Sequence, residues 1–173
     1  RKYGSLNEFK NYSETKVKET LKERYNSLKN AYKYMHDKGD ETKRKRGTFN
    51  TSKPEELGYK MLYNKFGFCN VKRQYKSKEY PFACDFYIKN INTYIEFNFF
   101  WSHGGHKYDP HNIDDLKQTE YWKEKSLTSD FYKCALHVWT VSDPLKFETA
   151  KKNNLNYLAF YTWNEFLEWY NKQ

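Results

Sequence analysis

The chain is poor in cysteine, proline and glycine, and it has no long apolar run. Its 173 residues include 3 Cys, 4 Pro and 7 Gly. Cys69, Cys84 and Cys134 are widely spaced and form no Cys-x-x-Cys pair, which argues against a disulfide scaffold and favours a reducing compartment. No stretch approaches the roughly 18–20 apolar residues of a membrane span or resembles a secretory signal. These absences argue against membrane, secreted and fibrous proteins, and they predict a cytoplasmic, intracellular one with no membrane partner.

Aromatic side chains are abundant. The sequence has 17 Tyr, 13 Phe and 5 Trp, which is 20% of its residues. A disordered chain rarely carries so many, so a real hydrophobic core is expected. The length favours one compact domain with an arm. The chain opens at Arg1 without a methionine, as expected of a piece of a longer protein.

The positive charge lies at the N-terminal end. The whole chain has a formal charge of +9, and residues 1–50 contribute +7 of it, with 14 basic and 7 acidic side chains. This asymmetry predicts a basic helical arm at 1–50 that contacts a polyanion, attached to a nearly neutral domain at 51–173. A solvated, lysine-rich helix is the alternative. One basic run is interpreted as a linker or a phosphate clamp: Lys43, Arg44, Lys45 and Arg46.

The order of the predicted elements indicates the fold class. Spacings of three and four predict a helix over 13–37, and the capping box of Ser52 and Glu55 begins a second helix that ends at Gly67. The buried face of the second helix is expected to contain Leu57, Met61, Leu62 and Phe66. Three strands follow as a meander over 69–76, 82–89 and 92–100, and then helix 114–128, strand 135–141, helix 143–153, strand 157–161 and helix 163–170. This pattern predicts an α/β (α+β) domain with a mixed sheet and flanking helices.

Two carboxylates stand alone in apolar strands. Asp85 and Glu96 are the acidic residues of the second and third predicted strands. If these strands pair across their short turn, the two side chains can converge at one end of the sheet. Buried carboxylates are costly unless they are paired or bind a metal, so a site for a hard divalent cation is expected here. Glu55, beside the apolar face of the preceding helix, can reach the same place. The alternative is that both strand residues face water.

Three histidines follow the Glu96 strand within nine residues. They are His103, His106 and His111. A histidine there could act as a general base towards water or contact phosphate. Zinc is a competing possibility, but no cysteine lies nearby, so no zinc is expected. A third alternative is a loop of surface histidines. Serine and cysteine nucleophiles find no support, because no Gly-x-Ser-x-Gly motif is present.

At these residues the sequence resembles the PD-(D/E)xK nuclease superfamily. Cys84-Asp85 takes the place of the Pro-Asp pair, and Glu96-Phe97-Asn98 takes the place of the (D/E)-x-K triplet. Within the superfamily it is most similar to very-short-patch-repair endonucleases and related phage homing endonucleases. The likeness covers residues 51–171 and also includes Glu55, the segment Phe100-Trp101-Ser102-His103, and the predicted helix 113–128. It implies a restriction-endonuclease-like core in a protein of bacteria or phage-infected hosts.

The resemblance implies a Mg²⁺-dependent endodeoxyribonuclease, with Mn²⁺ as a substitute. Asp85 and Glu96 would hold the ion, with the Phe97 carbonyl completing its shell and Glu55 binding a second ion or an outer water. His103 would deprotonate or position the attacking water, and His106 or Asp109 would steady it. The departure from the family is Asn98, which cannot supply the charge of the usual lysine.

Double-stranded DNA is the expected partner. Phosphate contacts are expected from the basic run at 43–46 and from Lys72 and Arg73. By the resemblance, Phe100 and Trp101 stand where the repair enzymes wedge aromatic rings between bases, although a buried core role is equally compatible with the sequence. Cleavage of both strands would call for a homodimer.

Three other functions are compatible with the sequence. The first is a non-catalytic nucleic-acid-binding protein with a decayed nuclease core, for which Asn98 is the sign. The second is a zinc-stabilised interaction module around His103, His106 and His111. The third takes RNA as the substrate, since the aromatic surplus permits base stacking, although no RNA-binding motif is present.

Overall fold

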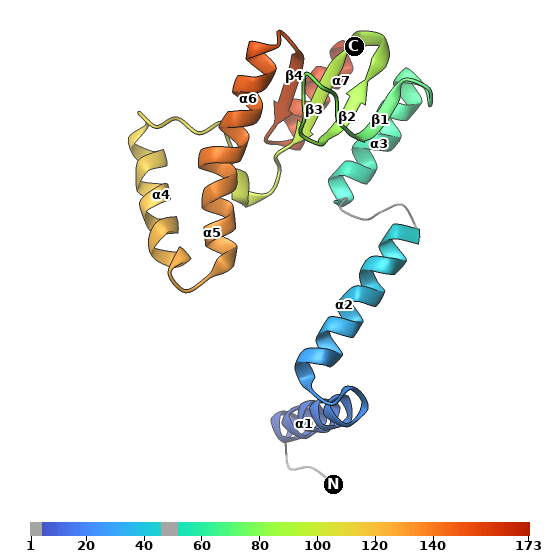
Figure 1. Ribbon diagram of the computed structural model, residues 1–173, viewed down its shortest axis with the longest axis vertical. Coiled ribbons are helices and arrows are strands. Elements are labelled where there is room, and N and C mark those ends of the chain that lie inside the picture. Colours follow the sequence, from blue (N-terminus) through green and yellow to red (C-terminus); the bar gives the residue numbers. More distant parts are fainter. Residues whose placement is uncertain (1–4, 46–51) are drawn as a thin grey trace. The chain divides into compact units, whose positions relative to one another are not determined.

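The computed structural model describes residues 5–45 and 52–173, apart from the side chains of Leu6, Phe9 and 43–45, and the chain separates into two compact units, residues 1–52 and 53–173 (Figure 1). Each unit is described by itself. The second unit has an α+β fold around a four-stranded mixed sheet. Across the described ranges, no helix combines the length and the apolar character needed to cross a bilayer.

The first unit consists of two helices, α1 (Leu6–Tyr25) and α2 (Leu28–Lys45). Ser5 caps α1 through a capping box with Glu8, and Asn26 ends it in the left-handed conformation at φ 61°. The prediction of a single helix over 13–37 is therefore wrong, because the chain turns at Asn26. The side chains of Lys43, Arg44 and Lys45 and all of Arg46 lie outside the described residues.

The second unit begins with α3 (Lys53–Phe66), where the sequence predicts a helix. Leu62 is fully buried, whereas Leu57 is 50% exposed, so the predicted buried face is wrong at Leu57. Gly58 takes its place in the core, because a Cβ at Gly58 would overlap the Phe97 ring. The absence of a side chain lets α3 lie close against the sheet.

The sheet has the order β1-β2-β3-β4. Neighbouring strands are antiparallel in the first two pairs and parallel in the last. Asn92, in the left-handed conformation at φ 46°, closes the short turn from β2 to β3. The predicted meander and last strand are thus confirmed, with shorter strands: β1 (Val71–Tyr75), β2 (Cys84–Ile88), β3 (Thr93–Phe97) and β4 (Asn156–Phe160).

The predicted strand over 135–141 is wrong. This segment is helical and belongs to α5 (Asp130–His137) and to a π-helical segment, Val138–Ser142, which continues directly into α6 (Asp143–Lys152). Ala135 and Trp139 are four residues apart, and both are buried in one cluster with Trp122 of α4 (Ile113–Ser126). A short apolar run has the same composition in a buried strand and in a buried helix face, so its pattern alone does not separate the two.

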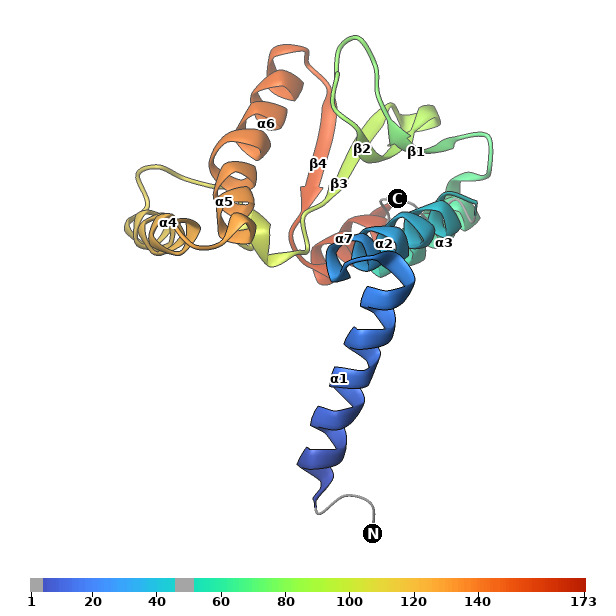
Figure 2. The same cartoon turned by 60° about the horizontal axis from the view of Figure 1, so that its bottom comes forward.

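Helices cover both faces of the sheet (Figure 2). On one side, α3 and α7 (Trp163–Lys172) pack Leu62 and Phe166 against an apolar face. On the other side, α6 packs Ala150 in a cluster with Tyr80 and Tyr94. The second side is the one that carries charge.

Candidate active site

Asp85 of β2 and Glu96 of β3 lie opposite each other on the side of the sheet that α6 covers. The paired register ends at Phe86 and Ile95, with Asp85 and Glu96 as the next residues along the two strands, and the charge of Glu96 adds to the raised pKa of Asp85. Residues opposite each other on an antiparallel pair have their Cβ atoms about 4.5–5.5 Å apart on the same face. The structure therefore brings these two carboxylates together.

Asp85 is held by main-chain and side-chain donors. Its Oδ2 accepts a hydrogen bond of 2.7 Å from the Phe97 N–H, and its Oδ1 accepts one of 3.4 Å from Gln74 Nε2. Burial raises the pKa of this carboxyl to about 7, and the negative charges of Glu96 and Glu55 add to the shift, while the Phe97 N–H opposes it. At neutral pH the group is close to its midpoint, so a nearby cation would readily deprotonate it.

Glu96 is buried deeper, with 4% of its surface exposed. Its Oε1 accepts a hydrogen bond of 2.9 Å from the Tyr80 hydroxyl, and its Oε2 lies 3.0 Å from Lys146 Nζ. Burial raises the pKa of Glu96, while Lys146 and Tyr80 oppose the rise. A charge at this depth is tolerated only because both oxygens have partners.

Helix α6 brings two residues to this site that the sequence analysis missed. Asp143 and Lys146 are one turn apart and therefore share a face of the helix. Asp143 is 3% exposed, and its charge adds to the upward shift of the pKa of Glu96, so it lies in the same cluster. The sequence did contain a signal for the position of α6. A helix that precedes a strand parallel to β3 starts near the C-terminal end of β3, which is where Glu96 lies.

His103 joins the cluster through Asp143. Its Nδ1 lies 2.6 Å from Asp143 Oδ2, and because a carboxylate oxygen accepts, this contact places the ring hydrogen on Nδ1. In the neutral ring, a hydrogen on Nδ1 leaves Nε2 as the acceptor, which is the arrangement that a general base needs. Gly104, the next residue, has a φ of 67° and lies against Trp139, where a Cβ would overlap the indole ring. A close contact with the helical layer thus fixes the backbone beside His103.

His106 has a different partner. Its Nε2 lies 2.8 Å from Asp115 Oδ1 on α4, and its carbonyl accepts a hydrogen bond of 2.8 Å from Trp139 Nε1. Asp115 also accepts from the Asp109 N–H, so it holds the loop at two points. The side chain of His111 is exposed. These contacts give His106 a loop-positioning role in the structure.

Asn98 and the aromatic pair that follows it occupy different environments. Asn98 is 3% exposed, its N–H donates to the Phe160 carbonyl, and its side chain lies beside Tyr161. Phe100 is 56% exposed and Trp101 is 37% exposed. Trp101 nevertheless packs edge-on against the buried Trp122 of α4 and contacts three further rings, so its ring contributes to packing although part of it is exposed.

The two basic residues predicted on β1 differ from each other. Lys72 is exposed. Arg73 pairs with Glu56 of α3 at 2.5 Å, and its guanidinium lies 4.8 Å from the centre of the Tyr59 ring. Its contacts join β1 to α3, so Lys72 is the one of the two that the structure presents to solvent.

The site combines two adjacent carboxylates, a lysine and a histidine–aspartate pair. In the described part of the chain, no three His, Cys, Asp or Glu side chains are close enough to one another to hold a metal ion. Comparison with family models, curated proteins and solved structures finds no match for this chain. The chemistry of the site must therefore be argued from its own residues.

Proposed function

We propose that the chain is a metal-dependent endonuclease that hydrolyses phosphodiester bonds in DNA, built on a restriction-endonuclease-like core. The observation that carries the proposal is the convergence of Asp85 and Glu96 on adjacent strands, where burial, and then the negative charge of Glu96, raise the pKa of Asp85 to about 7. Such repulsion between buried carboxylates is characteristic of sites built for a cation or for acid–base chemistry.

For a hard divalent cation, the described part of the site offers two carboxylates, and Glu96 would have to exchange its contact with Lys146 or Tyr80 for the ion. Asp85 and Glu96 offer carboxylate oxygens, which Mg²⁺ and Mn²⁺ prefer. Within a strand, the N–H and carbonyl of one residue point towards the same neighbour, so the Phe97 carbonyl faces Asp85 together with its N–H. Glu55 adds a third negative charge nearby. When bound, the ion would supply Lewis acidity and lower the pKa of a coordinated water.

The other residues of the cluster have complementary roles in this proposal. Asp143 holds His103 with Nε2 as an acceptor, which allows His103 to take a proton from water. Lys146 lies 3.0 Å from Glu96 and supplies, from α6, the positive charge that Asn98 cannot supply from β3. A positive charge placed there would stabilise the negative charge that develops on a phosphate oxygen.

DNA is the substrate that the charge distribution favours. The formal charge of +9, with its excess at the N-terminal end, suits a polyanion whose binding releases counterions. The exposed Lys72 can add a phosphate contact on the second unit. One such site cuts one strand at a time, so concerted cleavage of both strands would point to two copies of the chain.

Incubation with supercoiled plasmid in Mg²⁺, Mn²⁺ or EDTA tests the proposal. We expect nicked or linear product with either metal and none in EDTA. Asp85→Asn should lower the rate by more than about 100-fold, since losing even an outer-shell partner of a metal ligand costs about 10–100-fold. Asp114→Asn is the matched control, because Asp114 lies on α4 with its side chain exposed and bridges only to Lys117 among the ion pairs in the described residues.

The alternative function gives a different result in the same experiment. A non-catalytic protein with a decayed core would retain DNA binding in a mobility-shift assay and produce no metal-dependent product. Asn98 in the place of the usual lysine is the observation that favours this alternative. An Asp85→Asn variant that cuts as fast as Asp114→Asn would also contradict the proposed site.

A further inference from the structure

Next to the acidic cluster, a pocket of about 560 Å³ lies at the ends of β3 and β4. Phe99 follows β3, Tyr161 and Thr162 follow β4, and α3 and α7 contribute the rest of its wall. The rings of Phe99 and Trp163 meet edge-to-face at 5.9 Å. The residues that line the pocket are Lys53, Pro54, Leu57, Phe99, Tyr161, Thr162 and Trp163.

The pocket is joined to the cluster on two sides. Asn98 directly precedes Phe99, and its side chain lies beside the buried Tyr161 hydroxyl, which has no hydrogen-bond partner of standard geometry among the described residues. The start of α3 provides the second connection. Leu57 lines the pocket, and Glu55, two residues before it on the same helix, adds to the negative charge at Asp85. The charge of Asp143 also adds to the raised pKa of Tyr161, so the wall of the pocket lies within electrostatic reach of the acidic cluster.

We infer that this pocket holds one unpaired nucleobase of the strand whose phosphate lies at the acidic cluster, an inference that rests on the proposed nuclease function. Aromatic walls favour a planar ring, because base–aromatic stacking is worth about 1–3 kcal/mol per base. Pockets for extruded bases combine stacking surfaces with a few polar groups, as this one does with Lys53 and Thr162 at its margin.

The charges around the pocket select a base over a phosphate as the deep occupant. Acidic side chains stand in the first turns of both helices that border it, Glu55 on α3 and Glu165 on α7. Glu165 also accepts a hydrogen bond from the Tyr161 N–H, and Thr162 accepts one from the Glu165 N–H, so the start of α7 is already capped. Lys53 brings one positive charge to the pocket wall, and the negative charges at both helix starts offset it, which suits a neutral ring better than an anion.

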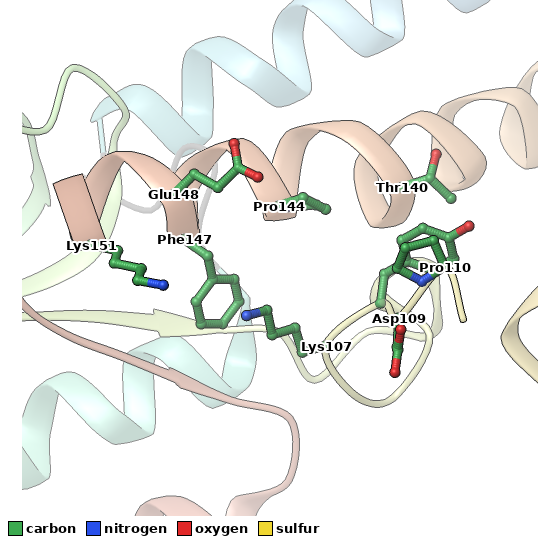
Figure 3. A pocket seen from close by; sticks show the side chains of 9 residues that line it. Lys107, Asp109, Pro110, Thr140, Pro144, Phe147, Glu148 and Lys151 are labelled. Atoms are coloured by element: carbon green, nitrogen blue, oxygen red, sulfur yellow. The ribbon is translucent and has the colours of Figure 1, made fainter. Parts of the chain in front are cut away.

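A second hollow, on α6, lacks this character (Figure 3). It has a volume of about 770 Å³ and lies between α6 and the loop at 107–110. Lys107 already lies over the Phe147 ring, at 4.7 Å from its centre, and Lys151 and Glu148 place opposite charges along the same wall. Its aromatic surface is therefore covered, whereas the rings of the first pocket line open space.

The test uses single-stranded oligothymidine with one central 2-aminopurine, whose fluorescence is quenched when it stacks on an aromatic ring. Binding is measured in EDTA, so the result does not depend on cleavage. Leu57→Arg should place a long, non-aromatic side chain over the pocket from its half-exposed position on α3 and abolish the quenching. Leu116→Arg is the matched control, because Leu116 is 43% exposed on α4 and lines neither of the two pockets.

Leu57→Asp provides a second variant that should lower binding by adding a negative charge at the pocket mouth, and thermal melting checks that each variant folds. Unchanged quenching in both Leu57 variants, or no quenching with the wild-type chain, would overturn the inference. If the Leu57 variants changed only the sedimentation coefficient of the protein and not the quenching, the inference would also be overturned. The pocket would then be a contact surface for a second copy of the chain. Quenching without plasmid cleavage would support the pocket and contradict catalysis, and cleavage without quenching would do the reverse.

Discussion

The two faces of the sheet are built from different chemistry. The face towards α3 and α7 is a cluster of apolar side chains: Leu62, Val71, Phe86, Ile88, Ile95, Phe97, Phe160 and Phe166. The face towards α6 buries Tyr80 and Tyr94 together with Glu96, and Asp85 lies at its margin. The first face gains free energy from every side chain that it buries, whereas the second buries carboxylates whose pKa values are raised.

Under the proposed function, stability and catalysis are served by separate faces of one sheet. Burying the two carboxylates costs free energy, and even a few kcal/mol is a large share of the net stability of a domain of this size. The apolar face must therefore supply the stabilisation that offsets this cost. Phe97 links the two faces: its ring packs into the apolar cluster, and its N–H donates to Asp85. We expect substitutions on the first face to cost stability and substitutions on the second to change pH dependence and metal binding.

The largest effect is expected at Phe166. This side chain is fully buried, and its ring contacts those of Phe97 and Phe160, so Phe166→Ala should lower the free energy of unfolding by about 3–5 kcal/mol. Urea denaturation measures this. Phe68→Ala is the matched control, since Phe68 is 67% exposed and its loss should cost about 0.5 kcal/mol or less. Equal losses in the two variants would contradict the assignment of the core.

Breaking the ion pair on the other face should cost less and depend on pH. Lys146→Met leaves Glu96 buried without its cation, so we expect a loss of about 2 kcal/mol at pH 8. Because the pKa of Glu96 is raised in the folded protein, its protonated form is favoured there, and the loss should shrink as the pH falls. Urea denaturation at pH 8 and at pH 5 measures the difference.

Adding Glu96→Gln to Lys146→Met provides the control for that prediction. The amide oxygen keeps the hydrogen bond from the Tyr80 hydroxyl and removes the uncompensated charge. The double variant should recover part of the stability at pH 8 and show little pH dependence. A loss in Lys146→Met that is the same at both pH values would mean that packing, and not charge, is what Lys146 provides.

Asp85→Asn should stabilise the protein at high pH. The pKa of this carboxyl is about 7 in the fold against a usual 3.8, so the wild-type chain loses stability as the pH rises from about 4 through 7. The amide keeps an acceptor for the Phe97 N–H and carries no charge. We expect a gain of roughly 1–3 kcal/mol at pH 8 and no difference near pH 4. Lower stability than wild type at pH 8 would contradict the electrostatic account.

The smallest effect is expected from the metal itself. Mg²⁺ should raise the Tm of the wild-type chain by about 2–5 °C, because a ligand that binds only the folded state stabilises it. The shift should be larger at pH 8 than at pH 6, since the metal requires the deprotonated form of Asp85. Differential scanning fluorimetry measures this, with Asp85→Asn as the variant that should show no shift and Asp114→Asn as the one that should.

The sequence was sufficient for the meander and for the placement of Asp85 and Glu96 on its second and third strands. Their spacing around a short turn fixes the register, and register fixes the face on which each side chain lies. The sequence did not predict the helical structure of residues 135–141, because this segment is helical through the packing of Trp139 against Trp122 of α4, a contact distant in the sequence. The prediction that Leu57 is buried failed for a related reason. Gly58 lies close against the Phe97 ring, so the side of α3 that contains Gly58 faces the core and Leu57 is half exposed.

Long-range partners could not be predicted from local patterns. Lys146 lies 50 residues from Glu96 in the sequence, and Asp143 lies 40 residues from His103. Nothing in the composition of helix 143–152 distinguishes these two side chains from its other polar residues. Only the direction of β4, parallel to β3, places the start of this helix above the site.

The π-helical segment Val138–Ser142 lies between two helices with separate tasks. A π turn contains one residue more than an α turn, so residues after it are rotated by about 100° relative to a continuous α-helix. Ala135, before the segment, and Trp139, at its start, pack in the cluster with Trp122 of α4, whereas Lys146, after the segment, contacts Glu96 of the sheet. Deleting one residue here would keep α4 and α5 packed together but would rotate Asp143 and Lys146 away from Glu96. The extra residue of the π turn therefore sets the rotation that lets one continuous helical segment pack against α4 at one end and against the sheet at the other.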